Sequence, residues 1–497
     1  MEFSSILFIW VFLPIALIGY CLLFTLSKRS TNRTKLLNGF LLAASFVFYF
    51  YAGFKELLLL LAMILVNYGA GRWIGQLPDE NKRRKTVFIA ALAVNLLILG
   101  FFKYFNMLIT LTEILFTHRG GLTGLAFALA KFDANGSSHA LRIAMPLAIS
   151  FTTFQSVSYL ADVYKKRTSA EGDLLRFALY ISFFVQIVQG PIMRFQDLGG
   201  QIRERSHSPQ HFAEGIIRFS FGLGKKVIIA NTLALTCDRI WGKGLGELYC
   251  AEAWLGLVMF LLQIYYDFSG YTDMAVGIGQ MFGFRISENF NYPFTSQSVQ
   301  EFWRRWHISL STWFRDYVYI PLGGSRKGEG RTILNYFIVF LLTGVWHGGN
   351  LNFIGWGVLV AIQIILEKRF LGAWLKKNPI KPLNCLYAFF SILMGAVLFR
   401  SPNLYTAVKF YGALFHPAVV NTETTILSYF NADLFIALFA ALFCAGFVQR
   451  AAQPFYERIR DKSPVVVLRI VWAFAILIWS VMSIMNGSYN PSIYTNF

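Results

Sequence analysis

Long apolar runs recur along the whole chain, separated by short polar stretches. Most runs reach the roughly 20 apolar residues that a helix needs to cross the hydrocarbon core of a bilayer. An α-helix also satisfies its backbone hydrogen bonds within one segment. The pattern therefore predicts an all-α, polytopic membrane protein with about 10–13 membrane helices, some tilted, broken or re-entrant. The expected spans are 3–26, 36–54, 57–74, 86–105, 143–161, 174–193, 212–236, 253–283, 332–348, 351–367, 383–399, 433–449 and 464–485.

Basic clusters follow three of these runs, at 28–35, 82–85 and 165–167. Lys and Arg concentrate in cytosolic loops, so we expect the N-terminus outside and the loops 27–35 and 75–86 inside. The first run is too long for the apolar part of a cleaved signal and lacks a positive start, so we expect a retained span. No linker or repeat divides the chain, which predicts one membrane-embedded domain over residues 1–497.

Composition supports a membrane body and excludes several classes of protein. Of the 497 residues, 56% are hydrophobic and only 14% charged, which excludes disorder and a soluble disulfide scaffold. The net charge of +19 is better explained by cytosolic loops that meet anionic lipid head groups than by nucleic acid. The five cysteines are scattered, and zinc, Walker A, GxGxxG and GxSxG motifs are absent. We expect no metal site and no bound cofactor.

Two acids interrupt the apolar stretch QIYYDFSGYTD, namely Asp267 and Asp273. Ionisable side chains at membrane depth are costly, and they usually face a cavity or a partner. One interpretation is a substrate or ion pathway. The other is a buried ion pair or cap that only fixes helix packing.

The segment 301–316, EFWRRWHISLSTWFRD, is expected to form one amphipathic helix. At helical spacing Trp303, Trp306, Leu310 and Trp313 share a face, while Arg304 and Arg305 supply charge. An interfacial helix on the cytosolic leaflet explains the Trp and Arg residues. A docking surface for an anionic donor explains them too, because Arg suits phosphate contacts.

Two histidines stand out in these stretches. His307 follows Trp306, and His347 ends the apolar run LLTGVWH before two glycines. A neutral imidazole can act as a base near neutral pH, although a buried structural histidine is the ordinary alternative. Trp346 and Asn352 flank His347 and are further candidates for substrate contact.

Seven motifs between about residues 146 and 357 resemble, in order, those of the membrane-bound O-acyltransferase (MBOAT) family, and in particular its bacterial alginate O-acetyltransferase branch. They are PLAISFTTFQSVSYLADVY from Pro146, QIVQGPIMRF from Gln186, FGLGKKVIIAN from Phe221, QIYYDFSGYTDMAVGIGQMFGF from Gln263, ENFNYPF from Glu288, EFWRRWHISLSTWFRDYVYIPLGGSR from Glu301 and LLTGVWHGGNLNFIGWG from Leu341. At 349–350 the chain has Gly-Asn where this branch often carries alanine and a hydroxyl residue.

The resemblance implies roles by position. It makes His347 the catalytic histidine and His307 a second functional histidine near the cytosolic side. It implies a central chamber in an MBOAT fold whose most family-like core is 146–370. His307, the Trp346 indole and backbone N–H groups near Gly348 are then alternative donors to the oxyanion that acyl transfer forms.

The implied activity is transfer of an acyl group, expected to be acetyl, from a cytosolic thioester such as acetyl-CoA. The acceptor would be a cell-surface polysaccharide, reached directly or through an extracytoplasmic acetyltransferase partner at a bacterial inner membrane. Three alternatives remain from the sequence: D-alanyl transfer to teichoic acid from a carrier protein, a secondary transporter or flippase that uses Asp267 and Asp273, and a membrane scaffold.

Overall fold

The computed structural model describes all residues except 118–120, 134–142, 245–246, 417–425, 488 and 492–497. Its first third consists of α1 (Leu13–Leu26), α2 (Arg33–Phe50), α3 (Phe54–Gln76), α4 (Lys82–Thr117), α5 (Gly121–Ala130), α6 (Ile149–Tyr164) and α7 (Leu174–Ser182). A π-helical turn at Phe8–Phe12 leads directly into α1.

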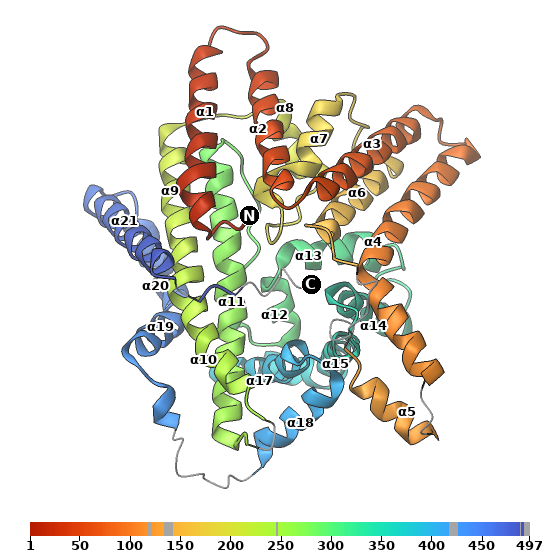
Figure 1. The fold of residues 1–497 in the computed structure, drawn as a ribbon, viewed down its shortest axis with the longest axis vertical. Helices are drawn as coiled ribbons and strands as arrows, with labels where there is room; N and C mark the ends of the chain where they lie inside the picture. Colours follow the sequence, from red (N-terminus) through yellow and green to blue (C-terminus); the bar gives the residue numbers. More distant parts are fainter. Residues whose placement is uncertain (118–120, 134–142, 245–246, 417–425, 488, 492–497) are drawn as a thin grey trace.

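The middle of the chain contains α8 (Phe195–Arg203), α9 (Pro209–Gly224), α10 (Asn231–Trp241), α11 (Cys250–Met281), α12 (Val299–Arg305), α13 (Ile308–Phe314), α14 (Glu329–His347) and α15 (Leu351–Leu366). The last part contains α16 (Gly372–Lys377), α17 (Lys381–Arg400), α18 (Leu404–Phe415), α19 (Ala432–Phe443), α20 (Phe447–Ile459) and α21 (Ser463–Met485). No strand occurs in the described part of the chain, so the predicted all-α class is confirmed. The short helices α12 and α13 lie in the middle of the molecule, with α11 on one side and α14 on the other (Figure 1).

Five described helices are long and apolar enough to cross a membrane, or six if the bent pair α19–α20 counts as one span. The 10–13 membrane helices that we expected include tilted, broken and re-entrant ones, so these long helices are one part of that set. Several predicted spans are shorter or broken because they lie inside the protein rather than against lipid. The predicted span 174–193, for example, stays α-helical only to Ser182 and continues as a 3-10 turn at Phe184–Gln186.

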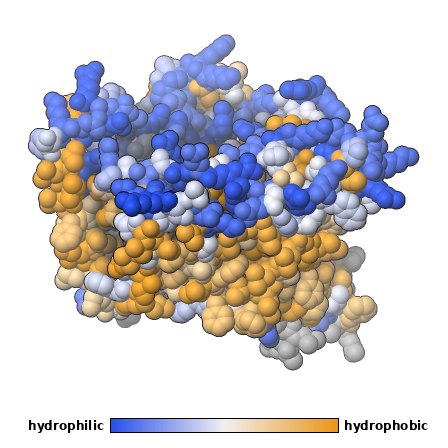
Figure 2. Space-filling model, turned by 90° about the horizontal axis from the view of Figure 1, so that it is seen from above, coloured by the Kyte–Doolittle hydropathy of each residue, from blue (hydrophilic) through white to orange (hydrophobic). Residues whose placement is uncertain are grey.

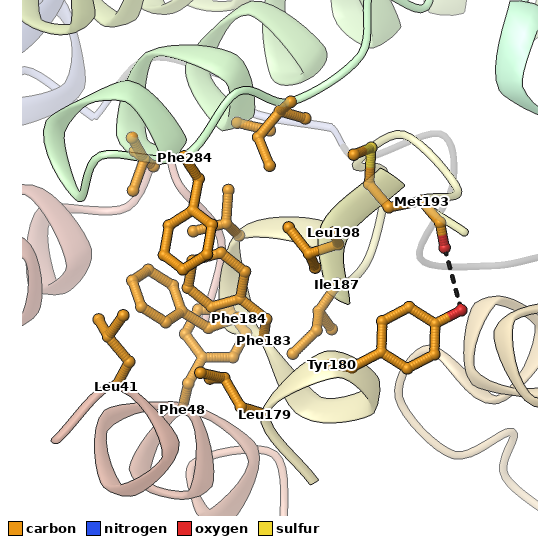
Figure 3. Packing of buried hydrophobic residues seen from close by; sticks show 14 of the residues in the cluster. Leu41, Phe48, Leu179, Tyr180, Phe183, Phe184, Ile187, Met193, Leu198 and Phe284 are labelled. Carbon is orange, nitrogen blue, oxygen red and sulfur yellow. Dashed lines mark hydrogen bonds between the residues drawn. The ribbon is translucent and has the colours of Figure 1, made fainter. Parts of the chain in front are cut away.

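The broken part of this span lies in the largest hydrophobic core. Phe183 and Phe184 are buried there against Phe48 and Phe284, and Tyr180 donates to the carbonyl of Met193 at 3.3 Å (Figure 3). Irregular backbone is tolerated at membrane depth only where protein surrounds it. The apolar run at 174–193 therefore marks a buried segment and not a lipid-facing helix.

Two of the three basic clusters, at 82–85 and 165–167, lie close together. Arg84 donates to the carbonyls of Val163 and Tyr164, and Lys166 pairs with Asp79, so the loops after α3 and α6 meet. Figure 2 shows hydrophilic side chains gathered along one side, above a broad apolar belt. This arrangement agrees with the one-sided loop charge that the sequence predicts.

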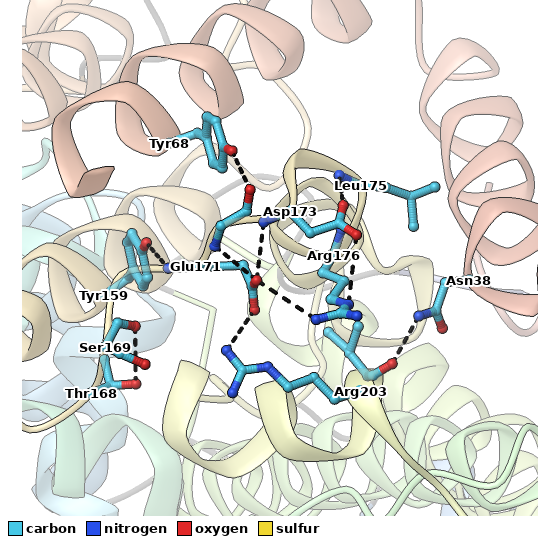
Figure 4. Close-up of polar contacts among 12 residues, drawn as sticks. Asn38, Tyr68, Tyr159, Thr168, Ser169, Glu171, Asp173, Leu175, Arg176 and Arg203 are labelled. Atoms are coloured by element: carbon cyan, nitrogen blue, oxygen red, sulfur yellow. Dashed lines mark hydrogen bonds and ion pairs between the residues drawn. The ribbon is translucent and has the colours of Figure 1, made fainter. Parts of the chain in front are cut away.

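Glu171 organises the loop between α6 and α7 on this face (Figure 4). Its carboxylate accepts the backbone N–H groups of Gly172 and Asp173, at 2.9 and 3.1 Å, and pairs with Arg203 of α8 at 2.9 Å. Tyr159 in α6 accepts the N–H of Glu171 itself at 3.0 Å. The polar face is thus tied together by buried and half-buried contacts as well as by surface charge.

Glycines allow α14 and α15 to approach backbone to backbone. A Cβ on Gly344 would lie 2.4 Å from the carbonyl oxygen of Phe353, and one on Gly357 would lie 2.4 Å from that of Phe340. Small residues of this kind let membrane helices pack closely. The contact fixes the last turn of α14, which ends at His347.

We expect Gly357→Ala to destabilise the protein by about 1–3 kcal/mol, because the new methyl group overpacks this contact. The apparent melting temperature in detergent micelles measures the effect. Gly355→Ala on the same helix is the matched control, since its Cβ would lie 3.6 Å from the nearest side-chain atom, on Leu398. Equal melting temperatures for the two variants would contradict the close contact.

Candidate active site

His347 is the last residue of α14, and its side chain is buried among aromatic rings. Its ring centroid lies 4.9 Å from that of Trp346, 5.1 Å from that of Trp356 and 5.0 Å from that of Phe399. The hydroxyl of Tyr104 in α4 donates to the carbonyl of Val345 at 2.5 Å, which anchors the same turn. The imidazole is therefore held from three sides.

The segment 301–316 does not form the single amphipathic helix that we expected. It divides into α12 and α13 at His307, which adopts a left-handed conformation with φ 45°. The preceding segment supplies the hydrogen bonds that the break releases: Ile308 N–H donates to the carbonyl of Asn289, and Asn291 N–H donates to that of Arg305, both at 2.9 Å. These hydrogen bonds to the segment 289–291 stabilise the break, although the spacing of apolar residues favours a continuous helix.

Asn289 also fixes the protonation of the His307 ring. Its Oδ1 accepts the backbone N–H of Ser309 at 3.0 Å, and a backbone N–H can only donate, so this atom is the amide oxygen. His307 Nδ1 lies 3.2 Å from the same oxygen and must therefore carry the proton. Burial lowers the pKa of His307 to about 3, so the ring is neutral and its Nε2 presents a lone pair. That Nε2 is buried and has no hydrogen-bond partner in the described part of the protein.

Both histidines line one cavity of about 440 Å³ among α12, α13 and α14. A second cavity of about 50 Å³ lies among α11, α15 and α17 and also reaches His347. Four side chains line both cavities, namely Trp303, Trp306, His347 and Trp356. The imidazole of His347 therefore stands where the two cavities adjoin.

The larger cavity has a cationic side, where Arg304 and Arg315 line it. Arg315 pairs with Asp316 at 2.6 Å, and Arg194 pairs with the same carboxylate at 2.7 Å. Burial would raise the pKa of Asp316, but its hydrogen bonds to the two guanidinium groups lower it overall. Arg304 forms no ion pair with any described residue, so its charge is available to a ligand.

This cationic side lies on the face that carries the basic loops. Tyr317, which follows Arg315 and Asp316, donates to the carboxylate of Asp162 near the end of α6 at 2.7 Å. Asp162 in turn lies 3.6 Å from Arg167 in the third basic cluster. The cavity is thus approached from the face that we expect to be cytosolic.

Three other candidates lie away from the two cavities. Asp267 pairs with Lys226. Asp273 pairs with both Lys225 and Arg218, at 2.6 Å in each case. Both acids therefore serve the packing of α11 against the π-helical turn Lys225–Ala230 and α9. Asn352 donates to the carbonyls of Leu398 and Ser401, at 3.0 and 2.8 Å, and joins α15 to α17.

Arg305 and Trp346 are the remaining candidates, and neither of them lines either cavity. Arg305 points to Glu301 at 2.7 Å and lines neither cavity, unlike its neighbour Arg304. Trp346 lies behind the cavity, with its ring centroid 6.3 Å from that of His307 and stacked on Phe154. The Trp346 ring thus lies near both histidines but lines neither cavity.

Sequence reasoning missed residues whose importance depends on distant contacts. Glu367 accepts the N–H groups of Val299 and Gln300, at 2.6 and 3.1 Å, and so fixes the start of α12. Asn289 stands in the motif ENFNYPF, but nothing in that motif indicates its contact with His307. Trp356 lines both cavities, although in the sequence it looks like an ordinary apolar helix residue.

Comparison with known proteins identifies the family. The family model of MBOAT, the membrane-bound O-acyltransferase family, matches residues 96–404. The chain belongs to the membrane-bound O-acyltransferase family. The resemblance found in the motifs is thereby confirmed, and the chain is a multi-pass membrane O-acyltransferase.

Three MBOAT relatives show the range of similarity. A probable alginate O-acetylase of Pseudomonas putida is 40% identical over 415 residues, covering 84% of this chain and 80% of the relative. A peptidoglycan O-acetyltransferase of Helicobacter pylori is 34% identical over 438 residues, covering 82% and 78%. A teichoic acid D-alanyltransferase of Bacillus subtilis is 31% identical over 258 residues, covering 48% and 62%.

We expect Asn289→Ala to reduce acyl transfer strongly, because the His307 ring loses the contact that sets its tautomer. Loss of a tautomer-setting partner costs up to about 10⁴-fold in kcat in a well-studied catalytic triad, so a loss of at least about tenfold is expected here. Initial rates at matched protein concentration measure it. Ser309→Ala is the control, since the Ser309 backbone N–H still holds Asn289. Equal rates for the two variants would refute this role of Asn289.

Proposed function

We propose that this membrane O-acyltransferase moves an acetyl group from cytosolic acetyl-CoA to hydroxyl groups of a cell-surface polysaccharide, across a bacterial inner membrane. The relatives named for alginate and peptidoglycan O-acetylation support the acetyl group and the polysaccharide. One observation carries the proposal: the larger cavity opens on the basic face and reaches His347. Arg304 lines it and forms no ion pair with a described residue.

The donor thioester enters the larger cavity in this proposal. Arg304 would bind a phosphate of CoA at the mouth, as guanidinium groups do well. The pantetheine arm would lie along Trp303, Trp306 and Tyr336, which line the cavity, with the thioester near His347. The lone pair of His307 Nε2 suits an N–H of that arm or the O–H of the acceptor.

The chemical step is a direct transfer with His347 as general base. The acceptor hydroxyl gives its proton to the imidazole while its oxygen bonds to the thioester carbonyl carbon. The carbon–sulfur bond of the tetrahedral intermediate then breaks, and the thiolate takes the proton back from His347 to leave free CoA thiol. Protons and electrons balance without a covalent enzyme intermediate.

The oxyanion of that intermediate needs a hydrogen-bond donor. His307 does not suit this task in its resting tautomer, since its Nε2 has no proton. The Trp303 indole is better placed, because Trp303 lines both cavities and its buried N–H has no described partner. Trp346, also with a buried unpartnered indole N–H, lies further back.

The acceptor would approach from the other end of α6. A depression of about 240 Å³ lies there, lined by Ala52, Glu56, the segment 145–151 and Val188. Phe151 of this depression contacts Trp346, with ring centroids 6.2 Å apart, so these two rings stand between it and His347. Their movement would admit the acceptor, presented directly or by an extracytoplasmic acetyltransferase partner.

The transporter alternative loses its main support, because Asp267 and Asp273 are both neutralised by basic partners. Proton-coupled transporters instead place such acids at a substrate pathway. D-alanyl transfer is an activity within the same family, but the teichoic acid D-alanyltransferase of Bacillus subtilis matches only about half of this chain.

His347→Ala should lower acetylation of the surface polysaccharide by about 10²–10⁴-fold, the usual contribution of a general base. Bound acetate per unit of polysaccharide, at equal protein level in the membrane, measures the loss. His211→Ala is the control, since His211 lines neither cavity. Near-normal acetylation by His347→Ala would remove the general-base assignment.

Arg304→Ala should raise the KM for acetyl-CoA by about tenfold or more, because a charge-assisted contact contributes about 1.5–3 kcal/mol. Thiol release by the purified protein, in the presence of a hydroxyl acceptor, gives the KM. Arg305→Ala is a closely matched control, since this neighbour pairs with Glu301 instead. An equal rise in the KM for acetyl-CoA in both variants would mean that the donor binds elsewhere on the basic surface.

A further inference from the structure

The small cavity beyond His347 is distinct in size and chemistry from the donor cavity. Its volume is about 50 Å³, against about 440 Å³ for the larger one. One water needs about 10–15 Å³ on this scale, so the small cavity holds a group of roughly three or four non-hydrogen atoms. An acetyl group has three such atoms, a butanoyl group five and an octanoyl group nine.

The walls of this cavity are almost wholly apolar. Phe260 and Ile264 come from α11, Val360 from α15, and Ile392 and Ala396 from α17. Apart from His347 and three indole rings, the polar side chain among the described lining residues is Gln363, which donates to the carbonyl of Ser391 at 2.8 Å. No carboxylate is found among the described residues that line this cavity.

These walls discriminate between acyl groups by charge. A D-alanyl thioester carries an ammonium group, which is costly to bury without an opposite charge and a full set of acceptors. The Gln363 Oε1 is buried and has no described partner, but one neutral acceptor cannot satisfy the three N–H bonds of an ammonium group. An acetyl methyl group needs only apolar contacts.

We infer that this cavity is the acyl subsite and that it restricts the donor to short, uncharged acyl groups of two or three carbons. The inference rests on the proposed function, because it needs the thioester carbonyl to lie beside His347. The methyl end of the acyl group then points away from the donor cavity, between α11, α15 and α17. Ile392 and Ala396 form the α17 side of the subsite and limit the chain length.

The experiment uses the full-length protein in nanodiscs with a hydroxyl acceptor present and, as donors, acetyl-CoA, butanoyl-CoA, isobutanoyl-CoA and D-alanyl-CoA. Thiol release gives kcat/KM for each donor. Unaltered protein should prefer acetyl to butanoyl by tenfold or more. Ile392→Ala, which removes three carbon atoms from the wall, should shrink that preference at least tenfold by raising the butanoyl value. Ala396→Leu should increase the preference for acetyl over butanoyl, because the larger side chain fills part of the small cavity.

Leu393→Ala is the matched control for loss of side-chain volume, since Leu393 is a buried neighbour on α17 that does not line the cavity. It should leave the acetyl-to-butanoyl ratio unchanged. In Ile392→Ala, isobutanoyl should be accepted while D-alanyl, which has nearly the same shape but carries a charge, should still be rejected.

The outcomes separate the subsite from the proposed function. Thiol release with the same donor ratio in Ile392→Ala and Leu393→Ala would overturn the subsite alone. Acceptance of D-alanyl as readily as isobutanoyl would overturn its selectivity for uncharged groups. Failure of the unaltered protein to release thiol from any of the four donors would overturn the proposed function and the subsite together.

Discussion

A chain can leave the helical conformation inside a membrane protein only where another segment satisfies the backbone groups that it frees. The segment 288–292 meets that constraint for the break at His307. It accepts the Ile308 N–H with a carbonyl and the Ser309 N–H with the Asn289 amide oxygen, and it donates the Asn291 N–H to Arg305. Because of these contacts, α13 can turn away from α12 and His307 can face the cavity that holds His347.

Buried charged groups are subject to the same constraint, since they too need partners within the protein. Buried acids on α11 are neutralised by neighbouring lysine and arginine side chains, and Glu367 is used to hold the start of α12. Around the two histidines the surroundings are aromatic, and the buried polar atoms without a hydrogen-bond partner among the described residues include His307 Nε2, Asn289 Nδ2 and the indole N–H groups of Trp303 and Trp346. A reacting thioester would find a small number of fixed polar contacts in an otherwise apolar site.

Much of this arrangement could be predicted from the sequence, for identifiable reasons. The all-α class follows from the length of the apolar runs, and the common face of the loops follows from their Lys and Arg clusters. The two candidate histidines stand in motifs specific enough to indicate the family. Helical spacing, however, predicted one helix over 301–316, because periodicity takes no account of Asn289, which is distant in sequence. Spacing also could not separate Arg304, which lines the cavity, from Arg305, which pairs with Glu301. Where the expected spans are broken could not be predicted, because an apolar run buried in protein, such as 174–193, resembles one that faces lipid.

The central claim is that the donor binds from the face of the basic loops and that only its acyl group passes His347 to the other side. Sealed proteoliposomes of known protein orientation test it directly, with labelled acetyl-CoA supplied only to the side that carries loops 27–35 and 75–86. A hydroxyl acceptor, together with its extracytoplasmic transferase where one is required, is placed on the opposite side. We expect labelled ester on the acceptor side and free CoA thiol confined to the donor side. Ester formed only on the donor side, or equal activity when the donor is supplied from the opposite side, would contradict it.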